Sequence, residues 1–326
     1  MKPLVVIGGA IHADGIKQLE SEARVVVTNE ETETGMIKAA QEAAGILFRL
    51  KPNCTRSLMA ACKQLKVVGR HGAGLDTVDL EAATELGVAV VHAPGSNSNS
   101  VAEHAIMLML ACAKQAVVVD RRTRLVDWGK HRTQGLLEMH GRTLGIIGVG
   151  NIGRRVAKTG AALGMRVIGY DKYVPAEELK SRGVEPMPDM ASVLRQADVV
   201  TCHTPHTPET HHMINAQTIA QMKDGVIFIN TSRGKVQDEE ALRQGLESGK
   251  IRAAGIDVFE EEPVSSDSRL LQLDNVIVSP HIAGVTEETT RGMAMQVGAE
   301  MLRVLRGEKP HVLGNPELWP KLGHLT

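Results

Sequence analysis

The chain has 326 residues, a length that suits two domains, and its hydrophobic fraction of 43% is ordinary for a globular protein. The formal net charge of −1 points neither to nucleic acid nor to an anionic membrane as a partner. The four cysteines are scattered and form no CxxC pair, which argues against a disulfide framework and a cysteine zinc site, and fits a reducing cytoplasm.

Short β-branched strands alternate with helical segments along most of the chain. The first series of expected strands is Leu4–Ile7, Arg24–Thr28, Gly45–Phe48, Val67–Arg70 and Ala89–His92. The second series is Thr143–Gly148, Arg166–Tyr170, Val199–His203, Val226–Asn230, Ala253–Val258 and Val276–Ser279. Helical periodicity lies between them, for example at Thr34–Ala43, Arg56–Cys62 and Asp238–Ser248. This alternation predicts an α/β protein with parallel sheets covered on both faces.

A polar stretch at residues 94–100 separates the two series and is typical of a crossover between domains. Ser100, with Glu103 three residues later, has the pattern of a capping box and predicts the start of a long helix. The segment Val101–Val119 is apolar enough to suggest a membrane span, but charged residues such as Lys114 interrupt it. We therefore expect a helix buried in protein or at a subunit interface.

The two ends of the sequence carry signals of their own. The N-terminal strand lacks the apolar core of a signal peptide. The turn-rich tail should pack on the first domain.

A nucleotide-binding motif follows the strand that begins at Thr143. Gly148 permits a tight turn, Gly150 allows the backbone to approach a pyrophosphate, and Gly153 allows close helix–strand packing. The next strand ends at Asp171, where a carboxylate accepts the ribose hydroxyls of NAD and repels a 2′-phosphate. Lys172 beside it leaves some use of NADP open. The context of strand, glycine turn, helix and acidic residue predicts NAD as the cofactor.

Four ordered motifs resemble those of the D-isomer-specific 2-hydroxyacid dehydrogenases: Gly148–Gly153 with Asp171, Asn230–Gly234, Asp257–Pro263 and Ser279–Gly284. The resemblance covers nearly the whole chain. It is strongest to the 3-phosphoglycerate dehydrogenase and hydroxypyruvate reductase branch, without the C-terminal regulatory extension of some serine-pathway members.

The resemblance implies two doubly wound parallel-sheet domains, with an NAD-binding Rossmann domain inserted in a flavodoxin-like substrate domain. Residues 1–98 with 286–326 would form the substrate (catalytic) domain, and residues 99–285 the NAD-binding domain. It also implies a homodimer, which we expect to form through the helix that begins near Val101. The expected reaction passes a hydride between a nicotinamide and C2 of a small 2-hydroxy or 2-keto acid.

Three residues suit the chemistry of that reaction. Arg233 carries a planar guanidinium that binds a carboxylate bidentately and follows an expected strand, at the edge where α/β sheets bind ligands. His281 can donate and accept a proton near neutral pH. Glu262 directly precedes a proline, as the family's glutamate does, and a nearby carboxylate favours the imidazolium form of a histidine.

Further residues acquire roles from the resemblance. The expected substrate contacts are Arg49, at the position of a phosphate-binding arginine, and the glycine loop His71, Gly72, Ala73 and Gly74. The residues that directly follow Arg49, which are Leu50, Lys51 and Pro52, depart from the small polar residues that are usual in phosphate-binding relatives. Beyond the glycine turn and Asp171, the expected cofactor contacts are Val101, Asn151, Ile152, His203, Pro205, Thr210, Thr231, Ser232, Asp257, Ala283 and Gly284.

Three other interpretations deserve comparison. The histidine-rich segment His203–His212 suggests a metal site, but its prolines keep the histidines off one helix face and no cysteine is placed to help, so we expect no metal. Relatives that act as NAD-sensing corepressors share the fold, although no extra tail or linker for that role is evident. Formate dehydrogenases replace the glutamate by an amide, so Glu262 argues against them.

Overall fold

The computed structural model describes residues 2–49, 51–126 and 135–322, and divides into two compact units. The first unit joins both chain ends, Met1–Asn97 and Val285–Thr326, and the second is the continuous segment Ser98–Gly284. Each of the two divisions lies one residue before the boundary that the sequence predicts.

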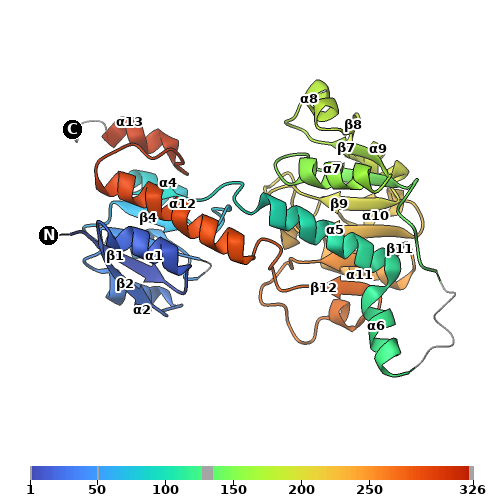
Figure 1. The fold of residues 1–326 in the computed structure, drawn as a ribbon, viewed down its shortest axis with the longest axis horizontal. Helices are drawn as coiled ribbons and strands as arrows, with labels where there is room; N and C mark the ends of the chain where they lie inside the picture. Colours follow the sequence, from blue (N-terminus) through green and yellow to red (C-terminus); the bar gives the residue numbers. More distant parts are fainter. Residues whose placement is uncertain (1, 50, 127–134, 323–326) are drawn as a thin grey trace. The chain divides into compact units, whose positions relative to one another are not determined.

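A five-stranded parallel sheet forms the centre of the first unit (Figure 1). Its strands lie in the order β2-β1-β3-β4-β5, the flavodoxin-like order. Their bounds are Leu4–Gly8 for β1, Arg24–Thr28 for β2, Gly45–Phe48 for β3, Val67–Arg70 for β4 and Ala89–Val91 for β5. All of the pairings are parallel, so the carboxyl ends of β3 and β4 meet at one edge.

Helices cover both faces of this sheet because successive strand residues point to opposite sides. On one face, Val5 and Leu47 pack against α1 (Ala13–Glu20) and the long C-terminal helix α12 (Glu287–Leu305). Figure 1 shows α12 beside α1, although they are far apart in the sequence. On the other face, α2, α3 and α4 supply the core; their bounds are Glu33–Ala40, Arg56–Ala61 and Leu80–Glu85.

The C-terminal tail packs on the first unit, as the sequence predicts. It contains a 3-10 turn, η3 (Pro316–Leu318), and a short helix, α13 (Trp319–Leu322). The fully buried Asn315 side chain accepts a hydrogen bond from Val90 N at 2.9 Å and donates one to Val88 O at 3.0 Å. The tail is thereby joined to β5.

The second unit contains a seven-stranded parallel sheet in the order β12-β11-β10-β9-β6-β7-β8. Reading from β6, this is the Rossmann order, with the reversal of direction between β6 and β9. The strand bounds are Thr143–Ile147 for β6, Arg166–Tyr170 for β7, Glu185–Pro186 for β8, Val199–Cys202 for β9, Val226–Asn230 for β10, Ile251–Ile256 for β11 and Val276–Val278 for β12. The two-residue β8 has no counterpart in the sequence prediction.

Two apolar layers enclose this sheet. Helices α5 (Ser98–Lys114) and α7 (Gly153–Ala162) pack on one face, and Figure 1 shows them side by side. The opposite layer contains α9 (Met190–Gln196), α10 (Ala216–Gln221) and α11 (Glu239–Glu247). The remaining elements are α6 (Ala116–Arg124), α8 (Ala176–Ser181), η1 (Gly234–Val236) and η2 (Arg269–Gln272).

The first helix of this unit differs from the sequence prediction in two respects. It begins at Ser98, so Ser100 is not its N-cap; the Ser100 hydroxyl instead donates a 2.6 Å hydrogen bond to Ala283 O. It also ends at Lys114, because Gln115 adopts a left-handed conformation with φ of 51°. No single helix in the described segments is long and apolar enough to cross a membrane; α5 and α6 together pass that test but are bent by 59°.

Candidate active site

The glycine turn after β6 has the close contacts that its sequence predicts. Gly148 has φ of 87°, and an added Cβ would lie 2.8 Å from His203 O. A Cβ on Gly153 would lie only 2.2 Å from Gly148 O, whereas a Cβ on Gly150 would meet no atom of the described residues within 4 Å. The turn is therefore closed on the protein side at Gly148 and Gly153, and open at Gly150, where the backbone can approach a phosphate.

Asp171 lies directly after β7 and contacts this turn. Its Oδ2 accepts a hydrogen bond from Val149 N at 2.8 Å, and its Oδ1 accepts one from Tyr173 N at 2.9 Å. Asn151 is exposed in the turn, and the partly buried Ile152 precedes α7. These residues lie together at the carboxyl edge of the sheet, beside the reversal point.

The loop after β9 contributes His203, Pro205 and Thr210 to the same edge. His203 N donates to Ile147 O, and its Nε2 lies 3.0 Å from Thr201 Oγ1. Burial lowers the pKa of His203 to about 3, so its imidazole is neutral at physiological pH. Thr210 Oγ1 donates to Pro205 O at 2.7 Å and closes the loop on itself.

Several buried polar atoms along this edge have no hydrogen-bond partner among the described residues. They are Nδ1 of His203, Oγ1 of Thr204 and Oγ1 of Thr231. A buried polar atom without a partner costs free energy, and a polar ligand would satisfy it. Together with the open face of Gly150, these atoms fit a dinucleotide bound across the glycine turn.

The loop after β10 places Arg233 next to the loop after β11. A Cβ added to Gly234 would lie 1.8 Å from Phe259 O, so only glycine allows these two backbones to touch. Arg233 Nη1 donates to Ser232 O, and Ser232 Oγ donates to Asn230 Oδ1 at 2.8 Å. Arg233 is close enough to Glu262 for its charge to lower the pKa of that carboxyl.

Asp257 connects the loops after β11 and β12. Its carboxylate accepts hydrogen bonds from Ser279 Oγ at 2.6 Å, from Ile282 N at 2.9 Å and from Ala283 N at 2.9 Å. His281 N also donates to Asp257 O at 2.8 Å. The Asp257 side chain is fully buried and occupied by protein groups, so its expected contact with the cofactor stays a prediction.

His281 and Glu262 face each other across these loops. His281 Nδ1 lies 2.7 Å from Glu262 Oε2, and Glu262 Oε1 accepts a hydrogen bond from Phe259 N at 3.0 Å. Burial raises the pKa of Glu262, but the bonds from His281 and Phe259 together with the Arg233 charge lower it below its ordinary value. His281 has a left-handed backbone, with φ of 54°, which is rare outside glycine and typical of functional sites.

Helix α5 supplies two contacts to this loop that the sequence analysis missed. His104 Nε2 lies 2.9 Å from Ser279 Oγ, and Ser100, one helical turn earlier, binds Ala283 O. The signal available in the sequence is a pair of polar residues at i and i+4 in a mostly apolar helix. Val101 is buried at 4% exposure, and Gly284 ends the unit.

The predicted substrate residues lie in the first unit, at the carboxyl ends of β3 and β4. Arg49 follows β3, and His71 follows β4 with its N donating to Phe48 O at 2.8 Å. Gly72 N donates to Arg70 O, and Ala73 O lies 2.8 Å from His92 Nδ1; Gly74 continues the loop. Burial, and next the charge of Arg49, lowers the pKa of His71 to about 4. Leu50 lies outside the described residues.

The histidine-rich loop pairs its rings with one another. His206 Nε2 lies 3.2 Å from His211 Nδ1, and His211 stacks on His212 with ring centroids 4.1 Å apart. Over the described ranges, no group of three or more histidine, cysteine, aspartate or glutamate side chains could hold a metal ion.

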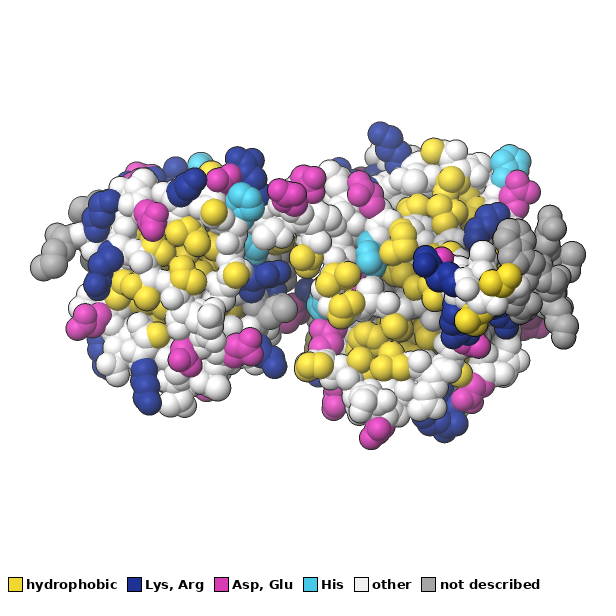
Figure 2. Space-filling model, turned by 60° about the horizontal axis from the view of Figure 1, so that its bottom comes forward, with side chains coloured by type: hydrophobic (Ala, Val, Ile, Leu, Met, Phe, Trp, Pro, Cys, Tyr) yellow, Lys and Arg dark blue, Asp and Glu magenta, His cyan; other side chains and the backbone are white. Residues whose placement is uncertain are grey.

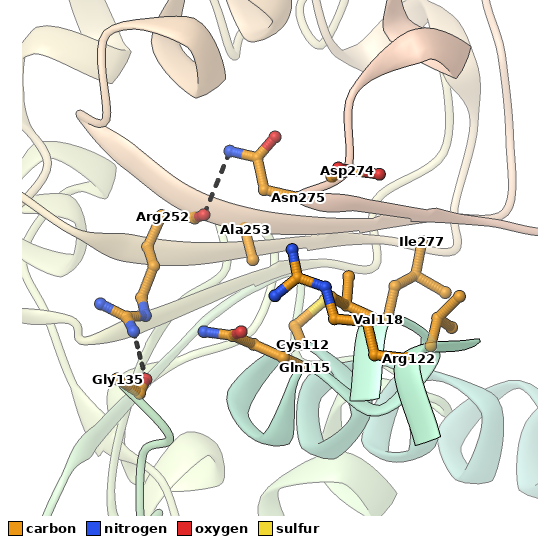
Figure 3. Close-up of a pocket in the computed structure, with 11 residues that line it drawn as sticks. Cys112, Gln115, Val118, Arg122, Gly135, Arg252, Ala253, Asp274, Asn275 and Ile277 are labelled. Carbon is orange, nitrogen blue, oxygen red and sulfur yellow. Dashed lines mark hydrogen bonds between the residues drawn. The ribbon is translucent and has the colours of Figure 1, made fainter. Parts of the chain in front are cut away.

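A separate cavity of about 440 Å³ lies in the second unit, at the amino-terminal edge of the seven-stranded sheet, opposite to the edge that carries the candidate site (Figure 3). It is lined by Cys112 on α5, Arg122 on α6 and Asn275 before β12, and Asn275 Nδ2 donates to Arg252 O at 3.2 Å. Arg252 also donates to Gly135 O. None of the predicted site residues lines this cavity.

Comparison with known proteins agrees with this geometry. Residues 106–283 match the family model described as D-isomer specific 2-hydroxyacid dehydrogenase, NAD binding domain. The chain is 41% identical over 323 residues to D-3-phosphoglycerate dehydrogenase of Methanocaldococcus jannaschii, covering 98% of this chain and 61% of that protein. It is 38% identical over 304 residues to hydroxypyruvate reductase of Thermotoga maritima, covering 92% of this chain and 98% of that protein.

A solved structure of D-lactate dehydrogenase from Aquifex aeolicus, complexed with NAD and lactic acid, matches with a TM-score of 0.83 at 29% identity, covering 98% of each chain. The chain belongs to the D-isomer-specific 2-hydroxyacid dehydrogenase family, and its second unit is the family's NAD-binding domain. It spans 61% of the length of the Methanocaldococcus relative.

Proposed function

We propose that this protein is an NAD-dependent D-2-hydroxyacid dehydrogenase that also reduces the corresponding 2-keto acid. The observation that carries the proposal is the 2.7 Å contact between His281 Nδ1 and Glu262 Oε2, at the carboxyl edge of a Rossmann sheet and beside Arg233. An imidazole oriented by a carboxylate near a guanidinium is the set of groups that proton transfer to a keto-acid oxygen requires.

The three side chains divide the work according to their chemistry. Arg233 binds the substrate carboxylate and polarises the 2-carbonyl. Glu262, whose pKa is lowered, is ionised at neutral pH and holds His281 through Nδ1. The Nε2 atom is thereby directed to the substrate, where it gives a proton to the oxygen during reduction and removes it during oxidation. The His281 side chain is 37% exposed, which keeps it accessible.

NAD, when bound, supplies or accepts the hydride at C2. Gly148, Gly150 and Gly153 would hold its pyrophosphate at the start of α7, with Asn151 and Ile152 beside it. Asp171 would accept the ribose hydroxyls, because each of its two oxygens can accept more than the one hydrogen bond that it receives from the described residues. The other proposed contacts are His203, Pro205, Thr210, Thr231, Ser232, Asp257, Ala283, Gly284 and Val101.

For the substrate, we propose a small acid of the glycerate or glycolate type. Relatives in both branches support it, one named D-3-phosphoglycerate dehydrogenase and another hydroxypyruvate reductase. Arg49 and the loop from His71 to Gly74 would bind its carboxylate and its distal group, which makes the first unit the substrate domain. A phosphate on the substrate would contact Arg49, whose positive charge already acts on His71.

We also propose a cytoplasmic homodimer that forms through α5 and α6. Met107 on α5 and Val117 on α6, both in the second unit, are 46% and 56% exposed. Figure 2 shows hydrophobic side chains gathered on one face of the second unit. Exposed apolar patches of this kind mark protein interfaces. The cytoplasmic assignment is supported by four free, buried thiols, as expected in a reducing compartment.

A substrate panel tests the proposed activity. NADH oxidation is followed with glyoxylate, hydroxypyruvate, pyruvate and phosphohydroxypyruvate, with NADPH as the control cofactor. We expect turnover with NADH and at least one of these acids. Tight NADH binding without turnover on any of them would contradict the dehydrogenase and favour an NAD-sensing binding protein.

A further inference from the structure

A bridge of three side chains joins two loops at the carboxyl edge of the second unit. Lys172 and Tyr173 follow β7, and Glu209 lies in the loop after β9. Lys172 Nζ lies 2.6 Å from Glu209 Oε1, and Tyr173 Oη donates to Glu209 Oε2 at 3.0 Å. Both carboxylate oxygens are therefore occupied, and the ammonium is fixed by a partner on another loop.

The bridge lies at the ribose end of the glycine turn. Strands β7 and β9 pair with β6 on its two sides, so a contact between the loops that follow them spans the carboxyl end of β6. Lys172 directly follows Asp171, whose carboxylate accepts hydrogen bonds from Val149 N and Tyr173 N. A 2′-phosphate on the adenosine ribose would thus meet the Asp171 carboxylate and the immediate neighbourhood of Lys172.

Recognition of a 2′-phosphate needs a cation that is available to it, because the group carries close to two negative charges. Lys172 is the neighbouring cation in the sequence, but Glu209 holds its ammonium. Arg182, which also contacts the turn, donates to Val149 O and to Glu178. The pairing with Lys172, and next the bond from Tyr173, lowers the pKa of Glu209, so its negative charge persists at neutral pH.

We propose that Glu209 is a specificity-determining residue that favours NAD over NADP by pairing with Lys172, so that the ammonium beside the 2′-phosphate position is already neutralised. Asp171 repels the phosphate directly, and Glu209 neutralises the cation that would otherwise offset this repulsion. Lys172 and Glu209 are about half exposed, at 55% and 54%, so water and salt screen their interaction. Its contribution to cofactor choice is therefore a few-fold effect added to that of Asp171.

The test is direct binding of NADH and NADPH by isothermal titration calorimetry, with the full chain and its Glu209→Gln variant. We expect the variant to bind NADPH about threefold to fivefold more tightly, and its NADH affinity to change by less than about twofold. An unchanged NADPH affinity would overturn the inference. A second variant, Lys172→Met with Glu209→Gln, should lose the gain; a gain that survives it would show that Lys172 is not the group being held.

Glu185→Gln is the matched control. Glu185 pairs with Arg166 at 2.6 Å with both side chains 48% exposed, and Arg166 begins the same strand that ends before Asp171. This variant removes the same charge from β8, where Glu185 pairs with the residue that begins β7, and should leave NADPH affinity unchanged; an equal gain would overturn the inference. Because cofactor binding needs no keto acid, the measured NADH and NADPH affinities do not depend on the outcome of the substrate panel. The inference does rest on the proposed use of NAD, and a wild-type protein that does not bind NADH would overturn both.

Discussion

His281 Nδ1 lies 2.7 Å from Glu262 Oε2, although nineteen positions separate the two residues in the sequence. The contact exists because the loops after β11 and β12 leave neighbouring strands at the same edge, and Asp257 binds one loop to the other. The acid–base histidine of the proposed reaction and the glutamate that orients it are therefore placed by strand order and by the buried carboxylate of Asp257.

Removing the Glu262 charge should lower the rate of reduction. Glu262→Gln replaces the carboxylate that lies 2.7 Å from His281 Nδ1 by a neutral amide, so the imidazole loses the charged partner that orients it. We expect kcat for keto-acid reduction to fall about tenfold to a hundredfold. The measurement is the rate of NADH oxidation. Glu261→Gln, which removes a charge from the adjacent exposed position, serves as the control, and an equal loss in both variants would refute the assignment.

Loss of the imidazole should abolish most turnover and spare cofactor binding. His281→Ala should lower kcat by about 10³, because general acid–base catalysis contributes roughly 10² to 10⁴. Alanine tolerates φ of 54° poorly, so His281→Asn is the companion variant, since asparagine adopts this conformation more readily. Turnover is measured with NADH and the best keto acid, and NADH affinity by calorimetry. Near-normal turnover in either variant would rule out His281 as the acid.

Two glycines of the turn should respond differently to alanine. In Gly153→Ala the Cβ meets Gly148 O at 2.2 Å, so the turn must shift and both stability and NADH affinity should fall. In Gly150→Ala the Cβ meets no protein atom within 4 Å, so the free energy of unfolding should change by less than about 1 kcal/mol while NADH affinity falls. Thermal unfolding and calorimetry distinguish the cases. Unchanged NADH binding by Gly150→Ala would contradict a pyrophosphate on this turn.

Asp257→Asn should impair catalysis through the position of His281. The amide NH₂ would face one of the donors that now bind the carboxylate, Ile282 N or Ala283 N, or the Ser279 hydroxyl. Leaving buried donors unsatisfied costs about 1–3 kcal/mol, so we expect lower Tm and a lower kcat. Asp267→Asn, on an exposed loop, is the control and should be close to wild type. A wild-type kcat in Asp257→Asn would show that this carboxylate does not position the histidine.

The first unit should lose stability in acid because His71 is buried and neutral. Burial and the charge of Arg49 lower its pKa to about 4 from 6.5, so the unfolded chain binds a proton that the folded chain does not between these values. The free energy of unfolding should therefore fall as pH drops from 6.5 towards 4, by about 2–3 kcal/mol from this group. Urea unfolding of wild type and His71→Gln at pH 7 and 4.5 measures it. Equal pH dependence in the two proteins would contradict the assignment.

Much of the fold was predictable because its signals are local. Apolar runs bounded by turn residues located nearly every strand, and Gly148–Gly153 with Asp171 marked the nucleotide turn, since strand, turn and helix follow one another in the chain. The predicted start of α5 at Ser100 is wrong. Serine has the chemistry of a helix cap, but the Ser100 hydroxyl donates its hydrogen bond to Ala283 O, 183 residues away in the sequence.

The sequence by itself determined which groups are available: a guanidinium at Arg233, a carboxylate at Glu262 and an imidazole at His281. Only the tertiary structure decided that they meet, because that depends on the adjacency of β10, β11 and β12, on the backbone contact at Gly234 and on the buried bonds of Asp257. The pairing of Lys172 with Glu209 has the same origin. Contacts between loops that follow different strands are set by strand order and packing, and no local pattern of residues encodes them.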